Sequence, residues 1–383
     1  MAGDRNVLVL GGGIGGIVAA RVLRKKLPED VRVVLVDRED SYVFAPSLLW
    51  LMSGDRKQQA ISSGRERLER KGIDFLRGEA EGLDADLRTV RVGGHDIPYE
   101  YLVVALGAQP APELMPGLRE GAKNIYSPDG ALEAGRALGQ LDGGRVAVVI
   151  ARLPYKCPAA PNEAALLAEA LLRHRGVKAD VALYTPEPFP MPTAGEAAGR
   201  AVAGMLAERG IELHASQTLQ EVDASKKELA FQSGERAGYD LLLAVPPHRT
   251  ASIVAGSGLA NDGGFMPVDA ATLATQADRI YAIGDVTQIP IAGGKFLPKA
   301  GVFAKAQAIV VANRIADEMA GREPSATFDG HGSCFVDMGD GVAAFATGDF
   351  YASGAPEVSL RRPSRRWHLA KVAFEKYWLA RWA

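Results

Sequence analysis

A glycine-rich turn between a short apolar strand and a helix constrains the fold most. Residues 7–10 are continuously apolar, as expected for a strand covered on both faces. The turn that follows matches G-x-G-x-x-G, and an apolar helical pattern begins after it at Ile17. The residues of the turn that we expect at the cofactor are Gly11, Gly13, Ile14, Gly15 and Gly16. The three spaced glycines allow a tight turn, close backbone approach to a pyrophosphate, and close helix packing. The helix N-terminus would add amides and partial positive charge for the phosphates.

A second strand and an acid complete this unit. The strand expected over Val31–Val36 ends at Asp37, which lies 21 residues after Gly16. An acid at this distance suits a hydrogen bond to a ribose hydroxyl. Strand, turn, helix, second strand and acid together predict an α/β dinucleotide-binding unit.

Two later segments indicate which dinucleotide is bound. Tyr101–Ala108 reads as a strand ending in a glycine turn, and Arg279–Asp285 reads as a strand ending in Gly-Asp. With the first unit, and in this order, they resemble the flavoprotein family of glutathione reductase, type II NADH dehydrogenases and sulfide:quinone oxidoreductases. The resemblance covers nearly the whole chain and implies FAD as cofactor. In that family the Gly-Asp acid bonds the ribityl chain and the Ala-x-Gly strand runs beside the cofactor. These roles would fall to Gly284 and Asp285, and to Ala105 and Gly107.

The resemblance also implies the architecture. We expect an α/β fold with two Rossmann-like dinucleotide-binding domains and a C-terminal strand-and-amphipathic-helix region. The expected divisions are residues 1–115 and 263–325 for the FAD-binding domain, 116–262 for the second Rossmann-like domain, and 326–383 for the C-terminal region.

The second Rossmann-like unit lacks a nucleotide fingerprint. Residues 145–150 form the expected strand, but the next residues, Ala151–Pro158, replace the glycine-rich turn with side chains and two prolines. These obstruct close approach of a pyrophosphate. The following strand, Val181–Tyr184, has no acid at its end. We therefore expect this unit to keep the fold without holding a nicotinamide dinucleotide.

A cysteine stands where that turn would be. Residues 155–163, with Cys157 and Glu163 six residues apart, resemble the signature of sulfide:quinone oxidoreductases and flavocytochrome sulfide dehydrogenases, in which a redox cysteine lies in a Pro-rich loop. A position near a helix N-terminus with Lys156 alongside predicts a favoured thiolate. Glu163 would relay protons. The alternative is an inert thiol in a capping segment, with a surface glutamate.

The second cysteine, Cys334, lies in a strand that enters a turn at Gly339–Gly341. This segment resembles the one carrying the second redox cysteine of sulfide:quinone oxidoreductases. Cys157 and Cys334 are 177 residues apart and can meet only through the fold. In a disulfide their Cα atoms should lie within about 7 Å, whereas a polysulfide bridge permits a wider gap. Many quinone-linked relatives use a third, upstream cysteine, and Tyr126–Gly135 contains none.

A lysine precedes the long helix expected over Ala304–Met319. In the family this helix points its N-terminus at the flavin pyrimidine, so Lys299, Gly301 and Val302 would lie beside the cofactor. The helix dipole would stabilise negative charge there. Lys299 would add positive charge or contact the quinone; the alternative is a surface lysine.

The C-terminal residues 364–383 have a helical apolar pattern. One side gathers Trp367, Ala370, Phe374, Tyr377, Trp378 and Trp382. Arg361, Arg362, Arg365 and Arg366 would attract anionic lipid. This predicts a monotopic helix in one leaflet, with a quinone entering between it and the flavin and Tyr377 flanking the quinone. The alternative is a tail that packs on a second subunit in a homo-oligomer.

The composition of the chain limits its expected cellular location and the kinds of partner that it binds. The net charge of −2 argues against a dedicated nucleic-acid partner. Met1–Arg5 is polar, so no secretory signal is expected, and no apolar run approaches the ~20 residues of a spanning helix. We expect a peripheral protein on the cytoplasmic side of the cell membrane, where a structural disulfide is disfavoured. No metal site is expected.

These features predict FAD-dependent oxidation of sulfide to sulfane sulfur or polysulfide through a Cys157–Cys334 redox pair, with electrons passed to a membrane quinone. Three alternatives stay open. A type II NADH dehydrogenase-like enzyme would need the missing nucleotide turn. A sulfide dehydrogenase subunit would donate electrons to a cytochrome, and a flavin redox sensor would switch a partner without turnover.

Overall fold

The first half of the fold is a parallel sheet in the order β20-β9-β1-β2-β5. The computed structural model describes residues 5–383, and Met1–Asp4 lie outside the described residues. The strands are β1 (Asn6–Leu10), β2 (Arg32–Asp37), β5 (Asp74–Arg77), β9 (Tyr101–Val104) and β20 (Ile280–Ala282). Helices α1 (Ile14–Lys26) and α9 (Gly301–Met319) pack together over one face, where Val7 and Val9 point. The other face, with Leu8 and Leu10, is covered by α8 (Ser252–Gly256) and the sheet of β6 (Ala80–Asp84), β7 (Thr89–Val92) and β8 (His95–Pro98).

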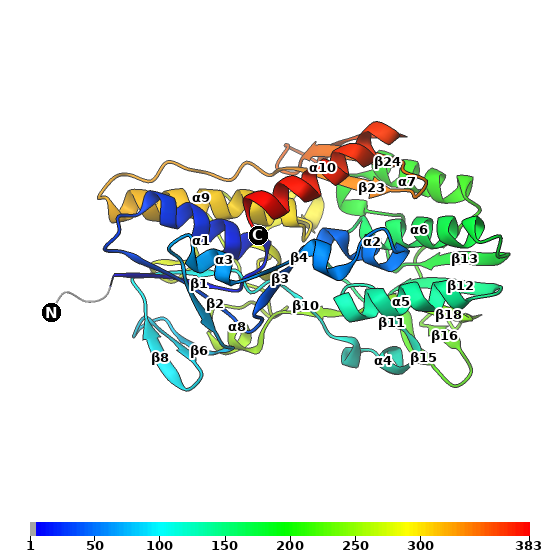
Figure 1. The fold of residues 1–383 in the computed structure, drawn as a ribbon, viewed down its shortest axis with the longest axis horizontal. Coiled ribbons are helices and arrows are strands. Elements are labelled where there is room, and N and C mark those ends of the chain that lie inside the picture. The colour runs from blue at the N-terminus through cyan, green and yellow to red at the C-terminus, as the bar shows by residue number, and fades with distance from the viewer. Residues whose placement is uncertain (1–4) are drawn as a thin grey trace.

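The second half is another parallel sheet, in the order β11-β18-β12-β13-β14. Its strands are β11 (Lys123–Asn124), β12 (Gly144–Ile150), β13 (Ala179–Tyr184), β14 (Glu212–His214) and β18 (Leu241–Val245). Helices α5 (Pro128–Gln140), α6 (Ala160–His174) and α7 (Glu196–Glu208) cover one face. The opposite face carries β15 (Leu219–Asp223), β16 (Glu228–Phe231) and β17 (Arg236–Gly238). The two sheets lie side by side along the long axis (Figure 1). The predicted α/β class is thus confirmed.

Short elements connect these layers. They are β3 (Ser41–Val43), α2 (Leu48–Ser53), β4 (Ser62–Gly64), α3 (Glu66–Glu69), β10 (Gln109–Pro110), α4 (Leu118–Gly121), β19 (His248–Arg249), β21 (Pro290–Ile291) and β22 (Lys295–Phe296).

The C-terminal region is a three-stranded antiparallel sheet followed by a helix. Its elements are β23 (His331–Asp337), β24 (Ala343–Asp349), β25 (Glu357–Ser364) and α10 (Arg365–Arg381). Helix α10 runs along the top of the molecule, above α2 (Figure 1). Among residues 5–383, no helix has the length and apolar character needed to cross a membrane.

The orientation of α10 corrects one prediction. Trp378 and Trp382 do not share an outward side with the other aromatic residues, because both are buried against the protein. The Trp378 ring stacks on Phe44, with ring centroids 5.8 Å apart. The outward side instead carries Leu369 and Tyr377, of which Leu369 is 66% exposed. Phe374 lies at the border, because its partly exposed ring also packs against Phe44, with ring centroids 6.0 Å apart. A period of 3.6 residues predicts an apolar stripe equally well for a lipid-facing and a protein-facing side.

Candidate active site

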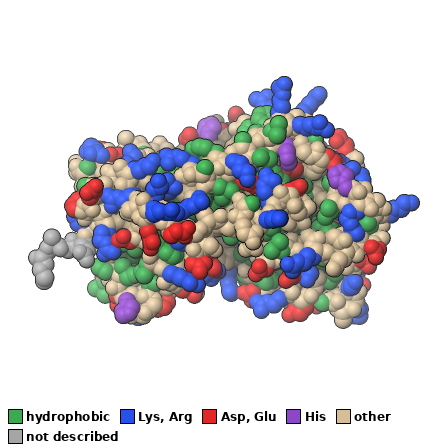
Figure 2. Space-filling view, in the orientation of Figure 1, with side chains coloured by type: hydrophobic (Ala, Val, Ile, Leu, Met, Phe, Trp, Pro, Cys, Tyr) green, Lys and Arg blue, Asp and Glu red, His purple; other side chains and the backbone are tan. Residues whose placement is uncertain are grey.

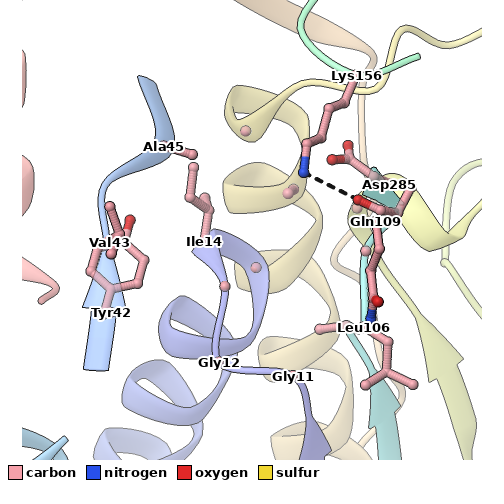
Figure 3. Close-up of a pocket in the computed structure, with 18 of the residues that line it drawn as sticks. Gly11, Gly12, Ile14, Tyr42, Val43, Ala45, Leu106, Gln109, Lys156 and Asp285 are labelled. Atoms are coloured by element: carbon pink, nitrogen blue, oxygen red, sulfur yellow. Dashed lines mark hydrogen bonds between the residues drawn. The ribbon is translucent and has the colours of Figure 1, made fainter. Parts of the chain in front are cut away.

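A cavity of about 540 Å³ lies at the carboxyl ends of the first sheet. Parallel α/β sheets bind ligands at this edge. Figure 3 shows the Gly11–Gly12 turn and Ile14 below, Tyr42 and Val43 on one side, and Lys156 entering from above. Lys156 belongs to the loop after β12, so both halves of the fold line the cavity.

The glycine turn packs tightly against the protein on one side and leaves free space on the side that faces the cavity. Gly11 has φ +95°, and a Cβ there would lie 2.4 Å from the Ala105 carbonyl oxygen. A Cβ on Gly16 would lie 1.7 Å from the Gly11 carbonyl oxygen, so α1 packs directly on the turn. A Cβ on Gly13 would meet nothing within 4 Å. The turn therefore leaves room for the close backbone approach that a pyrophosphate needs.

Asp285 presents an unsatisfied buried acceptor to this cavity. Its Oδ1 atom is buried without a hydrogen-bond partner among the described residues. Burial raises the pKa of Asp285, opposed by Lys156 and Lys299. A buried acceptor without a donor is costly. The hydroxyl groups of a dinucleotide cofactor's polyol or sugar would satisfy it. The amide of Gly284 is occupied, because it donates to Gln307 Oε1 at 2.7 Å.

Asp37 is engaged by an arginine that the sequence did not single out. Its carboxylate accepts hydrogen bonds from the Gly12 amide, from the Glu39 amide at 2.8 Å and from Arg65 Nη2 at 3.2 Å. Arg65 is buried and also donates to the Gly12 carbonyl oxygen at 2.9 Å. Arg65 thus fixes the turn against the acid and places a cation at the cavity wall.

Cys157 lines the cavity, but its thiolate is not favoured. Burial, and then the charge of Glu163, raise the pKa of Cys157 to about 12. The thiolate prediction is wrong because Lys156 does not pair with the sulfur. Its Nζ donates to the Ala108 carbonyl oxygen at 3.1 Å, the bond drawn as a dashed line in Figure 3. Helix α6 does begin three residues after the cysteine, at Ala160.

Cys334 lies on β23, as predicted, and does not line the cavity itself. Its Sγ contacts the Phe335 carbonyl oxygen at 3.3 Å. Burial, and then the charges of Cys157 and Glu163, raise the pKa of Cys334. The fold therefore brings the two cysteines into one electrostatic neighbourhood with Glu163. Both are free thiols in this structure.

Glu163 is not a surface glutamate, because it is only 5% exposed and lines the cavity. It accepts hydrogen bonds from the Asp337 amide at 2.6 Å and from Lys371 Nζ at 2.7 Å. Lys371 Nζ also lies 3.5 Å from Asp337 Oδ2. Burial would lower the pKa of Lys371, but Glu163 and Asp337 raise it. Burial and the neighbouring Asp337 raise the pKa of Glu163, opposed by Lys371. Glu163 is thus a buried carboxyl group paired with a lysine, and burial raises its pKa.

The other predicted residues divide into two groups. Lys299 lines the cavity and is not a surface lysine: it donates to the carbonyl oxygens of Asp285 at 2.8 Å and Thr287 at 2.9 Å. Burial lowers its pKa to about 8. Most of the predicted cofactor residues also line the cavity: Gly11, Gly13, Ile14, Gly15, Asp37, Ala105, Gly107, Gly284, Asp285 and Gly301. Gly16, Val302 and Tyr377 do not.

In a nucleotide-binding Rossmann unit, an acid at the end of the second strand would bind the ribose. Just beyond the corresponding strand here, β13, two side chains of the protein bind each other instead. The Tyr155 hydroxyl donates to Glu187 Oε2 at 3.1 Å, and both residues are buried. Glu187 lies three residues beyond β13, and burial raises its pKa to about 7. This carboxylate is already engaged by the loop that carries Cys157.

A family model described as pyridine nucleotide-disulphide oxidoreductase matches residues 5–309. The chain belongs to this family. A sulfide-quinone reductase from Aquifex aeolicus (strain VF5) is 29% identical over 98% of this chain and 90% of its own length. A mitochondrial sulfide:quinone oxidoreductase from Mus musculus is 25% identical over 90% of this chain and 78% of its own. The X-ray structure of the Aquifex aeolicus sulfide:quinone oxidoreductase matches with a TM-score of 0.90 and 26% identity, covering 98% of this chain and 90% of that one.

These similarities confirm the resemblance that the motifs indicated, including its extent over nearly the whole chain. The chain is an oxidoreductase of a flavoprotein family. Sequence reasoning missed Arg65, Gln307 and Tyr126, which no local motif marks.

Proposed function

We propose that this protein oxidises sulfide to sulfane sulfur or polysulfide with FAD as cofactor, and passes the electrons to a membrane quinone. The observation that carries the proposal is that the fold brings Cys334 close to Cys157 and Glu163, which line the cavity. The charge of Glu163 raises the pKa of both cysteines, and the charge of Cys157 raises the pKa of Cys334. The curated relatives that this chain matches over most of their length are named as sulfide oxidoreductases, which supports sulfide as the substrate.

The residues of the first sheet fit FAD. The open side of Gly13 would receive the pyrophosphate, and Asp37 and Arg65 would contact the adenosine side. Asp285 Oδ1 would accept a hydrogen bond from a ribityl hydroxyl. The α9 N-terminus and Lys299 would favour negative charge on the flavin. Bound there, FAD would take two electrons from sulfide sulfur and release them to a quinone. Residues 1–115 and 263–325 would form this FAD domain, residues 116–262 the domain carrying Cys157, and residues 326–383 the region carrying Cys334.

The cysteines would act as an oxidised, sulfur-bridged pair. Hydrosulfide attacks one bridge sulfur, so that a new S–S bond forms a persulfide while the old bond breaks and releases the other cysteine as a thiolate. Burial makes this thiolate unfavourable, because the pKa values of both cysteines are raised. Glu163, a buried acid with a raised pKa, lies close enough to raise the pKa of both cysteines and would supply or remove the proton at the carboxyl oxygen that Asp337 and Lys371 do not engage.

The outward side of α10 fits a lipid surface. Leu369 and Tyr377 are exposed there, and Arg365 and Arg366 are exposed at the start of the helix. Figure 2 shows basic side chains projecting from the top of the molecule beside hydrophobic ones. Aromatic residues favour the interface between lipid and water, and basic residues attract anionic headgroups. This supports the proposal of a peripheral protein on the cytoplasmic side of the cell membrane, in which Tyr377 would face the quinone-bearing leaflet.

Turnover with sulfide and a short-chain quinone tests the function. We expect quinone reduction that requires both sulfide and flavin, and no quinone reduction when NADH replaces sulfide. One-time oxidation of sulfide without turnover would favour a redox sensor and overturn the proposal.

Flotation with vesicles tests the membrane assignment. The protein should float with anionic vesicles, and the double variant Leu369→Ser/Tyr377→Ser should float less. Unchanged flotation of that variant would contradict the assignment of this surface.

A further inference from the structure

Cys157 has a backbone conformation that residues with side chains rarely adopt. Its φ is +55°, in the left-handed region. The conformation is unfavourable because Cβ crowds the following carbonyl oxygen. Of the non-glycine residues with positive φ in the described chain, Cys157 is the only one that lines the cavity. Such conformations persist where the surrounding structure holds them.

Three hydrogen bonds hold the Cys157 backbone. Its amide donates to the Lys299 carbonyl oxygen at 2.7 Å, which ties it to the segment before α9. Its carbonyl oxygen accepts from the Ala160 amide at 2.9 Å and from the Tyr126 hydroxyl at 3.2 Å. Only Tyr126 uses a side chain, and it follows β11 of the second sheet. The cysteine is therefore clamped between the two halves of the fold.

Tyr126 is itself rigidly held. Its amide donates to Asn124 Oδ1 at 2.9 Å, and its ring packs edge-on against His248 with centroids 5.4 Å apart. The His248 ring is fixed in turn by a hydrogen bond between Nδ1 and the Pro246 carbonyl oxygen at 2.9 Å. Burial raises the pKa of Tyr126 well above its usual value, so the hydroxyl remains a donor. Tyr126 lines the cavity beside the cysteine.

We propose that Tyr126 is a positioning residue: its hydroxyl holds the left-handed backbone of Cys157 and so sets the geometry in which the Cys157 sulfur pairs with Cys334. The proposal rests on the function proposed above, because it presupposes that these two cysteines form a redox pair. Tyr126 acts through the Cys157 backbone and needs no contact with the substrate.

The variant Tyr126→Phe removes the hydroxyl and keeps the ring packed against His248. The matched control is Tyr239→Phe, because the Tyr239 hydroxyl is buried in the second half of the fold without a partner among the described residues. The measurement is the equilibrium between dithiol and disulfide in glutathione buffers, read by alkylation and mass spectrometry. Oxidised glutathione takes two electrons from the two thiols as the S–S bond forms, and yields two reduced glutathiones.

The hydrogen bond is present while both cysteines are free thiols, so its loss frees the reduced loop to leave the left-handed conformation that the bridge requires. We therefore expect Tyr126→Phe to shift this equilibrium toward the dithiol by about 3- to 10-fold, the effect of one hydrogen bond. Tyr239→Phe should match the wild type. The urea unfolding midpoint is measured alongside, because a merely structural role would lower it without moving the redox equilibrium. A wild-type pair that bridges, with an unchanged equilibrium in Tyr126→Phe, overturns the role of Tyr126 alone. A wild-type protein that forms no bridge overturns both this role and the proposed function.

Discussion

Stability should fall as pH rises through neutrality because of one buried acid, Glu187. Its side chain accepts hydrogen bonds from the hydroxyls of Tyr155 and Thr185 in a buried setting that raises its pKa from 4.5 to about 7. Between these values the folded state binds more protons than the unfolded state, so the free energy of unfolding decreases with increasing pH. A shift of this size corresponds to roughly 3 kcal/mol, present below pH 4.5 and lost as pH passes 7.

The variant Glu187→Gln isolates this effect, because the amide keeps an acceptor for the Tyr155 hydroxyl and carries no charge. The measurement is the urea unfolding midpoint of variant and wild type at pH 5 to 9. The two midpoints should be nearly equal at pH 5. At pH 8 and above the variant should be more stable by up to roughly 3 kcal/mol. The exposed Glu29→Gln serves as control and should parallel the wild type. Parallel profiles for Glu187→Gln and wild type would refute the burial argument.

Three further outcomes follow from the site. Lys371→Met leaves Glu163 and Asp337 buried without their cation, so unfolding free energy at pH 8 should drop by about 3–5 kcal/mol. This loss of unfolding free energy should shrink toward pH 5, and adding Glu163→Gln should restore most of the stability. A loss that does not depend on pH in urea unfolding would contradict this. Asp285→Ala removes the buried acceptor, so flavin affinity should fall about 10- to 100-fold in equilibrium dialysis, and undiminished affinity would exclude its role. Anaerobic NADH should leave the flavin absorbance unchanged in the wild type, and bleaching by NADH would show that the second sheet still binds a nucleotide.

The first dinucleotide unit was predictable because its determinants are local. Strand, turn and helix between Asn6 and Lys26 follow from apolar pattern and glycine spacing, and the cavity lies where those glycines predict it. Asp285 was assigned a role only through the resemblance of its Gly-Asp turn to the flavoprotein family. Arg65 was not predicted, because its contacts with Gly12 span 53 residues and no local pattern marks them.

The chemistry at Cys157 depends on tertiary structure. Sequence proximity to Lys156 and a helix N-terminus predicted a thiolate, but the lysine side chain turns to the Ala108 carbonyl oxygen and burial dominates. The prediction of which side of α10 faces the protein was wrong for a related reason. Lys371 and Glu375 interrupt its apolar pattern, and they are paired by groups remote in sequence, among them Glu163 and Arg56. Hydrophobic periodicity cannot reveal such partners.

Anaerobic titration with sulfide tests the central claim most directly, with the flavin absorbance recorded for wild type, Cys157→Ser and Cys334→Ser. All three proteins should bind flavin and be bleached by dithionite, which controls for an intact cofactor site. Sulfide should bleach the wild type and leave both variants oxidised. Bleaching of Cys157→Ser by sulfide at the wild-type rate would contradict the account.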